Sequence, residues 1–531
     1  MPRLAAHPGG EDAVMRGALA GLRSRRRRET EPAGQDGKGL AGAGGAAPAA
    51  PARRGGHVAS PRLPALDSAR SGALSQALAR PSASTSTQMA GLAMAEVAPP
   101  TGAHGILLGL DVVTGSPVVH DPFVAYAEEP GFSSPNVVTF GDLGFGKSQL
   151  SKAWVLRNMM LGRRVIVVDK KRQDRTDGQA SEGEYSSMAR RLGFQPVTLR
   201  PGGGGVRINV LDSRIAGETS MGVAGQQMLL ESVISAAMGR GLTEVERLAV
   251  RVARRTAVLR GEAAGDVAHV GHVVDALLDP DEDVAARTPG VGSADTLRGF
   301  GRDCGFALDR LVSEELAGLI DGPTDPRLDL EGQLVTFDIS SLPEEGPAVP
   351  IMMSVIGTWV RAVLAASARP VPTLLVIDEA WHVVDGQFAE VARRNAKVAR
   401  GIALSNYTIF QHPSDIPAGS PAVAMIKEAQ TVVVFRQEKA DDAVEVCRLL
   451  GWDEEEAQRV LRLEQGVAMV KIGSAPPVVC SMIMSSFELE VGDTNQAMTS
   501  VATLSSPRAP TGEVEDHAAT TTAPQGQAGD R

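Results

Sequence analysis

The stretch GDLGFGKSQL, residues 141–150, matches the pattern GxxxxGK[ST] and decides the fold. Glycines let such a loop curl so that its backbone N–H groups point at a phosphate, and the helix that follows presents its positive end. The lysine neutralises the β- and γ-phosphates, and the hydroxyl after it is a ligand of Mg²⁺. The stretch therefore predicts a site for ATP and Mg²⁺. The residues expected to hold the nucleotide are Gly141, Asp142, Leu143, Gly144, Phe145, Gly146, Lys147, Ser148 and Gln149.

The segments around this loop have the patterns of strands and a helix. NVVTF (residues 136–140) is a short β-branched run, typical of a strand buried in a parallel sheet. SQLSKAWVLRNMMLG (148–162) has apolar residues at helical spacing and ends at a glycine, a favoured cap. RRVIVVDKK (163–171) gives a second buried strand. Strand, loop, helix and strand predict a right-handed crossover, and hence an α/β fold of the P-loop NTPase type with a parallel-rich central sheet.

Further elements follow the same rules. Other strands are expected within residues 104–122 (a pair with Gly115 at the turn), 194–201, 331–340, 373–379, 402–410, 430–437 and 467–473, and a helix at 350–366. Helical spacing of apolar residues predicts helices at 226–239, 243–259, 270–279 and 309–321, with a loop at 281–295. The middle of the chain is therefore predicted to be all-α.

These patterns divide the chain into five parts. Residues 1–100 and 491–531 are rich in small and polar residues and are predicted to be disordered, because they offer too little apolar surface to offset the entropy of ordering. Residues 101–216 and 323–490 are predicted to form the two parts of the ATPase domain, with 217–322 as an inserted all-α subdomain. If translation starts at Met89 or Met94, most of the first part is not made.

The formal net charge of −10 argues against a nucleic-acid coat but leaves room for a local basic patch. The run RSRRRRE (23–29) has two open interpretations, a solvated disordered segment or weak adhesion to anionic lipid or nucleic acid. The three cysteines lie far apart in sequence, which excludes a CxxC metal knuckle and suits a reducing compartment.

No membrane or export segment is predicted. The N-terminal arginines are not followed by a continuous apolar stretch, so a secretory signal is not expected. The most apolar run, residues 349–366, contains Arg361 and is predicted to be a buried core helix. The chain is accordingly expected to be cytoplasmic.

The second stretch with chemical content is LLVIDEAW, residues 374–381. Asp378 follows four apolar residues and is expected at the carboxyl end of a buried strand, where the sites of parallel sheets lie. There it can hold Mg²⁺ together with Ser148. Glu379 can polarise the water that attacks the γ-phosphate, which favours hydrolysis over phosphoryl transfer to another substrate. An acidic pair after a strand is a weak signal alone but a strong one together with the loop of Lys147.

Two further candidates lie downstream. Gln411 ends the expected strand 402–410 and can sense whether the γ-phosphate is present. The basic cluster ARRNAKVAR before it is mostly expected to be solvated, but one member, with Arg400 as the candidate, could act as an arginine finger on a neighbouring subunit. The basic residues of this cluster are Arg393, Arg394, Lys397 and Arg400.

The order GDLGFGKS, VIVVDKK, GEY, RINVLD, LVIDEAW, RGIALSNYTIFQ and VVVFRQ resembles the conjugative-transfer ATPases of type IV secretion systems, in the HerA–FtsK group. The resemblance covers roughly residues 105–486. It implies clamp roles for Lys147 and Ser148, metal and water roles for Asp378 and Glu379, and a sensor role for Gln411. It also implies a RecA/ASCE-like fold and a homo-oligomer in the form of a hexameric ring. The partners that it implies are secretion-channel or conjugation proteins, with peripheral association with a membrane complex.

The sequence also departs from the family. Phe410 precedes the sensor glutamine, where the family usually has threonine. The family's large N-terminal docking domain is expected to be either missing or reduced to the segment before Asn136. Three functions remain open. The first is a motor for pilus assembly or substrate transfer, and the second is a DNA-translocating motor, for which no basic loop stands out in the core. The third, an ATP-binding scaffold without turnover, has no use for Glu379.

Overall fold

The computed structural model describes residues 104–129, 131–173, 181–202, 205–217, 222–383, 391, 399–416, 420 and 422–492. All of them belong to one compact unit, Thr85–Arg531. The expected disordered segment 1–100, the basic run 23–29 and three members of the basic cluster (Arg393, Arg394 and Lys397) lie outside the described residues. The predicted C-terminal tail begins too early, because its first two residues, Val491 and Gly492, end a helix, α17 (Ser486–Gly492).

Within the described residues the centre of the fold is an eleven-stranded sheet, in the order β2-β1-β13-β12-β11-β3-β10-β9-β4-β8-β7. From β11 to β7 every neighbouring pair is parallel, while β12, β13, β1 and β2 extend the sheet with antiparallel pairs. The predicted parallel-rich α/β fold is therefore confirmed. The bounds are β1 (Ile106–Asp111), β2 (Pro117–His120), β3 (Val137–Phe140), β4 (Arg164–Asp169), β7 (Val197–Thr198), β8 (Leu334–Asp338), β9 (Thr373–Ile377), β10 (Leu404–Phe410), β11 (Thr431–Phe435), β12 (Val467–Ile472) and β13 (Val478–Met482).

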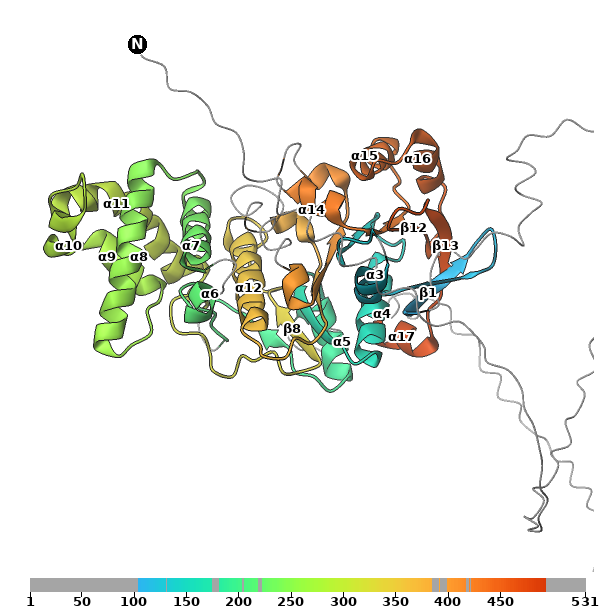
Figure 1. Ribbon diagram of the computed structural model, residues 1–531, viewed down its shortest axis with the longest axis horizontal. Coiled ribbons are helices and arrows are strands. Elements are labelled where there is room, and N and C mark those ends of the chain that lie inside the picture. Colours follow the sequence, from blue (N-terminus) through green and yellow to red (C-terminus); the bar gives the residue numbers. More distant parts are fainter. Residues whose placement is uncertain are drawn as a thin grey trace, which may run out of the picture. The chain divides into compact units, whose positions relative to one another are not determined.

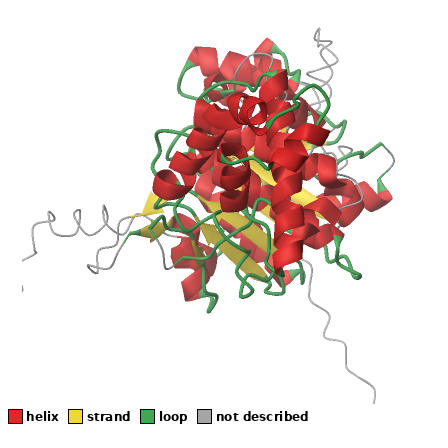
Figure 2. Ribbon diagram, turned by 90° about the vertical axis from the view of Figure 1, so that its left-hand side faces the viewer, coloured by secondary structure: helices red, strands yellow, loops and turns green. Residues whose placement is uncertain are grey.

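Both faces of the parallel part are buried, as alternation along β4 demonstrates. Val165 and Val167 belong to the core on one face, whereas Ile166 and Val168 belong to the core on the other. Side chains alternate across a strand, so a strand covered on both sides reads as a continuous apolar run. Helices cover the sheet on either side, as the red ribbons around the yellow strands in Figure 2 show.

Helix α4 (Lys147–Met160) and helix α12 (Ala348–Ala365) pack on opposite faces of the sheet, because their apolar side chains fall in these two different cores. The length and apolarity of α12 would suit a membrane span, but 83% of it is buried within the protein. Arg361 on this helix is only 1% exposed. The predicted core helix is thus confirmed, with its start two residues earlier than expected.

The chain between β7 and β8 is helical, as the green ribbons of Figure 1 show. Its apolar side chains join the core that covers one face of the sheet, so these helices and the sheet share a continuous core. The bounds are α6 (Ser213–Gly217), α7 (Gly222–Met238), α8 (Glu244–Ala264), α9 (Val270–Leu278), α10 (Glu282–Arg287), α11 (Ala294–Arg310) and a π-helical turn, η2 (Leu311–Glu315).

Two predictions in this region are wrong. The expected loop 281–295 contains α10, whose first turn is capped by the Asp281 carboxylate. The expected helix 309–321 is only the end of α11 and η2, and most of α11 lies before it. The sequence pattern did not predict the first part of α11, because this part contains glycines, which are poor helix formers. At Gly305 the small residue is needed, because a Cβ there would come within 2.6 Å of the Leu278 side chain on α9.

The remaining helices are α3 (Pro122–Glu128), α5 (Glu184–Arg191), α14 (Ala422–Glu428), α15 (Ala440–Leu450) and α16 (Glu454–Val460), with the 3₁₀ turns η3 (Ala380–Val383), η5 (Ala399–Ile402) and η6 (Pro413–Asp415). Of these, α5 and α14 to α16 contribute side chains to the cores on the faces of the sheet. The two short strands β5 (Arg172–Gln173) and β6 (Glu182–Gly183) pair separately. Strand β10 starts later than predicted, because η5 precedes it and Ala403 has a left-handed backbone with φ 53°.

Candidate active site

The loop of residues 141–148 connects β3 to α4 and has the backbone of a phosphate cradle. Gly141, Gly144 and Gly146 have φ values of 154°, 87° and 116°, which side chains disfavour. At Gly141 the space is closed as well, since a Cβ there would lie 2.5 Å from the Cβ of Phe435 on β11. The loop therefore owes its curl to these glycines, and α4 starts directly after it with Lys147.

Lys147 is folded back along this loop. Its Nζ donates hydrogen bonds to the carbonyl oxygens of Gly141 and, at 2.9 Å, of Asp142. Burial lowers the pKa of Lys147 to about 8, against the opposing effect of the Asp378 carboxylate. The side chain thus still carries most of its charge at neutral pH, in the place where the loop would hold phosphates.

Asp378 directly follows β9, which lies between β4 and β10 in the sheet. Burial, followed by the negative charges of Glu379 and Glu184, raises the pKa of Asp378 to about 6. Its Oδ1 accepts the backbone N–H of Glu379, but within the described part of the chain its buried Oδ2 has no hydrogen-bond partner. A buried carboxylate oxygen without a donor fits a cation, so Asp378 and the Ser148 hydroxyl are suited to hold Mg²⁺.

Glu379 has an unusual backbone conformation, and each oxygen of its carboxylate accepts one hydrogen bond. Its φ of 55° is left-handed, a strained conformation for this residue type. Gln411 Nε2, at the end of β10, donates to Glu379 Oε1 at 2.7 Å, and Trp381 Nε1 donates to Oε2 at 2.8 Å. The carboxylate is therefore held from two sides.

These residues open into one cavity of about 620 Å³ at the carboxyl ends of the parallel strands. That volume lies in the usual range of small-molecule sites. Of the predicted site residues, the cavity is lined by Leu143, Gly144, Gly146, Lys147, Ser148, Gln149, Asp378, Glu379 and Gln411. The structure thus brings together predicted residues from three separate segments of the chain.

Three side chains of the loop region contact other segments of the chain, and two of them, Asp142 and Phe145, do not line the cavity. Asp142 accepts the backbone N–H of Glu438 at 2.6 Å, and the Phe145 ring lies 5.3 Å from the guanidinium of Arg436. Gln149 lines the cavity but donates its Nε2 hydrogen to the carbonyl of Glu488 on α17 at 2.9 Å. Gly141 is likewise not part of the lining, so its contribution is the shape of the loop.

Arg400 is not brought to this cavity. It belongs to η5, which precedes β10, whereas Gln411 follows β10. The seven residues of β10 separate the two by about 20 Å along the strand. Within one subunit Arg400 therefore lies near the amino end of β10, whereas the cavity lies at its carboxyl end. A role as an arginine finger would require a neighbouring copy of the chain.

A buried ion-pair network beside the cavity was not predicted. Glu184, the first residue of α5, lies 2.7 Å from Lys152 Nζ and 3.1 Å from Lys171 Nζ. Lys171 Nζ also donates to the Ser148 hydroxyl at 3.3 Å. Burial alone would lower the pKa of Lys171, but the carboxylates of Glu184 and Asp378 outweigh it and raise that pKa. Lys171 is thus a second cation of the cavity, next to Ser148, the candidate metal ligand. The GEY stretch (183–185), which contains Glu184, is the sequence feature that could have indicated this network.

Helix α17 also reaches the cavity from the far end of the chain. Lys152 Nζ donates to the carbonyl of Gly492 at 2.9 Å, and Arg157 Nε pairs with the Glu488 carboxylate at 2.6 Å. Both cations belong to α4, so α17 is fastened to the helix that carries Lys147. This contact joins segments too distant in sequence for any local pattern to predict.

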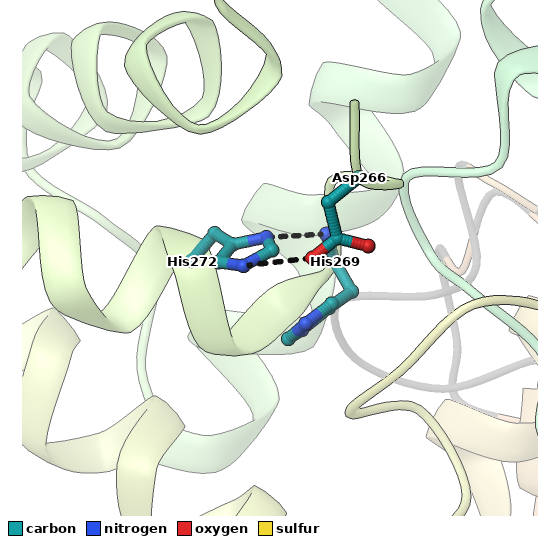
Figure 3. A group of neighbouring side chains, drawn as sticks. All are labelled: Asp266, His269 and His272. Atoms are coloured by element: carbon teal, nitrogen blue, oxygen red, sulfur yellow. Dashed lines mark hydrogen bonds and ion pairs between the residues drawn. The ribbon is translucent and has the colours of Figure 1, made fainter. Parts of the chain in front are cut away.

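A separate cluster in the helical region, Asp266, His269 and His272, resembles a metal-ligand group (Figure 3). Its hydrogen bonds have another explanation. His269 Nδ1 accepts the backbone N–H of Gly271 at 3.2 Å, and His272 Nδ1 accepts that of His269 at 3.4 Å. Both Nδ1 lone pairs are engaged with the backbone, and the arrangement caps the N-terminus of α9.

No family model and no curated protein matches the chain. Among solved structures, VirB4 of Thermoanaerobacter pseudethanolicus is similar with a TM-score of 0.60 and 22% sequence identity, over 74% of this chain and 100% of that chain. The plasmid coupling protein TrwB, solved in complex with ADP and Mg²⁺, is similar with a TM-score of 0.49 and 14% identity, over 72% of this chain and 90% of that chain. The chain therefore has the fold of VirB4, in agreement with the α/β fold that the motifs predict.

Proposed function

We propose that the protein is an ATP-hydrolysing motor that powers a conjugation or type IV secretion machine. One observation carries the proposal: the acidic pair Asp378 and Glu379 shares a cavity with Lys147 and Ser148. A phosphate-binding loop without the acidic pair would suit a protein that binds a nucleotide without hydrolysing it. A second carboxylate at the same cavity, beyond the one that suits a metal, adds a base for water.

In this proposal each residue has a defined task. The backbone N–H groups of residues 144–148 and the Lys147 ammonium bind the phosphates of ATP, and Ser148 and Asp378 hold Mg²⁺. When bound, Mg²⁺ supplies charge neutralisation for the phosphate oxygens. Glu379 accepts a proton from the attacking water, and Gln411 links that carboxylate to the region of the γ-phosphate.

The assembly follows from the same proposal. We infer a ring of identical subunits, a hexamer, at the cytoplasmic side of a membrane-associated secretion or conjugation complex. The VirB4 fold supports this inference.

The test is Mg²⁺-dependent ATP hydrolysis by the purified full chain, measured together with its mass in solution. We expect turnover by the wild type and none by Lys147→Ala, while Lys427→Ala, which removes an exposed lysine of α14, keeps it. Retained turnover in Lys147→Ala would contradict the site. Repeating the assay with double-stranded DNA distinguishes the two kinds of motor, because strong stimulation of hydrolysis would favour a DNA-translocating motor. ATP binding without turnover would instead favour a scaffold.

A further inference from the structure

The indole of Trp381 is joined to the catalytic carboxylate without lining the cavity. Its Nε1 donates to Glu379 Oε2 at 2.8 Å, while Gln411 Nε2 donates to Oε1 at 2.7 Å. Gln411 borders the cavity, and Trp381 is absent from its lining. Each carboxylate oxygen of Glu379 is therefore held by one donor. Gln411, which holds Oε1, borders the cavity, whereas Trp381, which holds Oε2, does not.

This support matters because Glu379 has reason to move. A glutamate side chain has several rotatable bonds, and a left-handed backbone persists only where its surroundings over-determine it. With φ at 55°, Glu379 needs contacts that keep its carboxylate in one place. A base must lie within hydrogen-bond reach of the proton it removes, so its orientation affects the rate directly.

We propose that Trp381 is a positioning residue for hydrolysis, fixing the Glu379 carboxylate through its indole N–H so that the carboxylate faces the attacking water. The inference rests on the proposed function, in which Glu379 is the base. Gln411 and Trp381 act as a pair, one on each oxygen. Since each carboxylate oxygen has two lone pairs, both oxygens keep the capacity to accept a further hydrogen bond from water.

The surroundings of Trp381 support a positioning role over a packing role. Trp381 is 37% exposed, whereas Trp154 and Trp359 are fully buried in the core. Its ring stacks on His382 with centroids 3.6 Å apart. Burial, with a smaller effect of Lys170, lowers the pKa of His382 to about 4, so this neighbour is neutral at pH 7.

The chain offers a matched control for the hydrogen bond. Trp381→Phe keeps an aromatic ring and removes the N–H. Trp452→Phe makes the same chemical change at an indole whose buried Nε1 has no hydrogen-bond partner within the described residues. Trp452 lies between α15 and α16, on a different part of the fold from the cavity residues.

In steady-state kinetics we expect Trp381→Phe to lower kcat about tenfold or more, the effect of one hydrogen bond to a charged group, with KM unchanged. Trp452→Phe should have the kcat of the wild type. A purely structural role of Trp381 would lower the melting temperature and the ADP affinity as well, and we expect neither to change. Wild-type kcat in Trp381→Phe, or a loss shared between kcat and ADP affinity, would overturn the proposal.

A second measurement needs no turnover. The chain has four tryptophans, so the indole N–H signals in a ¹⁵N-edited NMR spectrum can be assigned with the two Phe variants. We expect Glu379→Ala to move the Trp381 signal and leave that of Trp452 in place. An unmoved Trp381 signal would refute the contact, whereas a moved signal in a wild type that hydrolyses no ATP would refute only the proposed function.

Discussion

Gln411 donates a 2.7 Å hydrogen bond to Glu379, and this bond joins the carboxyl end of β10 to that of the neighbouring β9. It connects the residue expected to sense the γ-phosphate with the residue expected to activate water. The amide of Gln411 carries two N–H groups, so it can keep this bond while donating to a phosphate oxygen. The two strands thus form a single unit at the cavity.

We expect Gln411→Ala to reduce kcat about tenfold or more while ATP binding changes little, because it removes one of the two donors that orient Glu379. Steady-state hydrolysis and nucleotide titration on the same samples measure both quantities. Gln227→Ala on α7, whose amide donates to Glu231 away from the cavity, is the control. Unchanged kcat in Gln411→Ala would exclude the orienting role.

Asp378 should make stability depend on pH. Its pKa of about 6 lies above the ordinary value of 3.8, so between these limits the folded state holds a proton that the unfolded state has lost. Stability contributed by this group is therefore lost as pH rises through that window. Without nucleotide, Asp378→Asn should be more stable than the wild type at pH 8, by about 1–3 kcal/mol, and the difference should vanish near pH 4.

Denaturant unfolding at both pH values measures this effect. The control is Asp303→Asn, whose carboxylate is 69% exposed. Equal stability of wild type and Asp378→Asn at pH 8 would show that the buried charge has no cost. Hydrolysis should be lost in Asp378→Asn at every pH, because the neutral amide is a much poorer ligand for Mg²⁺.

Two glycines of the loop should tolerate alanine unequally. At Gly141 a Cβ would lie 2.5 Å from the Cβ of Phe435, whereas at Gly144 it would meet nothing within 4 Å. Both positions have positive φ, so backbone strain is common to both variants. We expect Gly141→Ala to lose ADP binding in calorimetry and Gly144→Ala to keep it with a modest loss. Equal binding by the two variants would mean that the contact with β11 does not shape the loop.

In the proposed ring, Arg400 is expected to act on hydrolysis only between subunits. Glu379→Gln should bind ATP without turnover, because the amide is not a base. Mixing Glu379→Gln with Arg400→Ala should then restore part of the activity, since some interfaces pair an intact Glu379 with an intact Arg400. Absence of rescue in mixed rings of verified composition would count against the finger.

Local patterns determined a large part of this protein. Glycine spacing and the apolar runs on either side were enough to predict the loop of Lys147 between a buried strand and a helix. The run before Asp378 likewise predicted a strand ending in an acidic pair. These inferences succeed because backbone freedom at glycine and the burial of apolar residues act over a few residues at a time.

Tertiary structure decided which of these segments meet. The apolar runs predict that β3, β9, β10 and β11 are buried, but they do not predict the order β11-β3-β10-β9. That order brings Gln411 within hydrogen-bond distance of Glu379. The C-terminal part of the described chain packs back on the fold, so that α17 contacts α4. Such contacts depend on packing between distant segments, where many pairings bury similar apolar area and only the whole core selects one. The sequence therefore sufficed to place Lys147 at the start of a helix and Asp378 at the end of a strand, while the support of Glu379 by Trp381 and Gln411 required the folded chain.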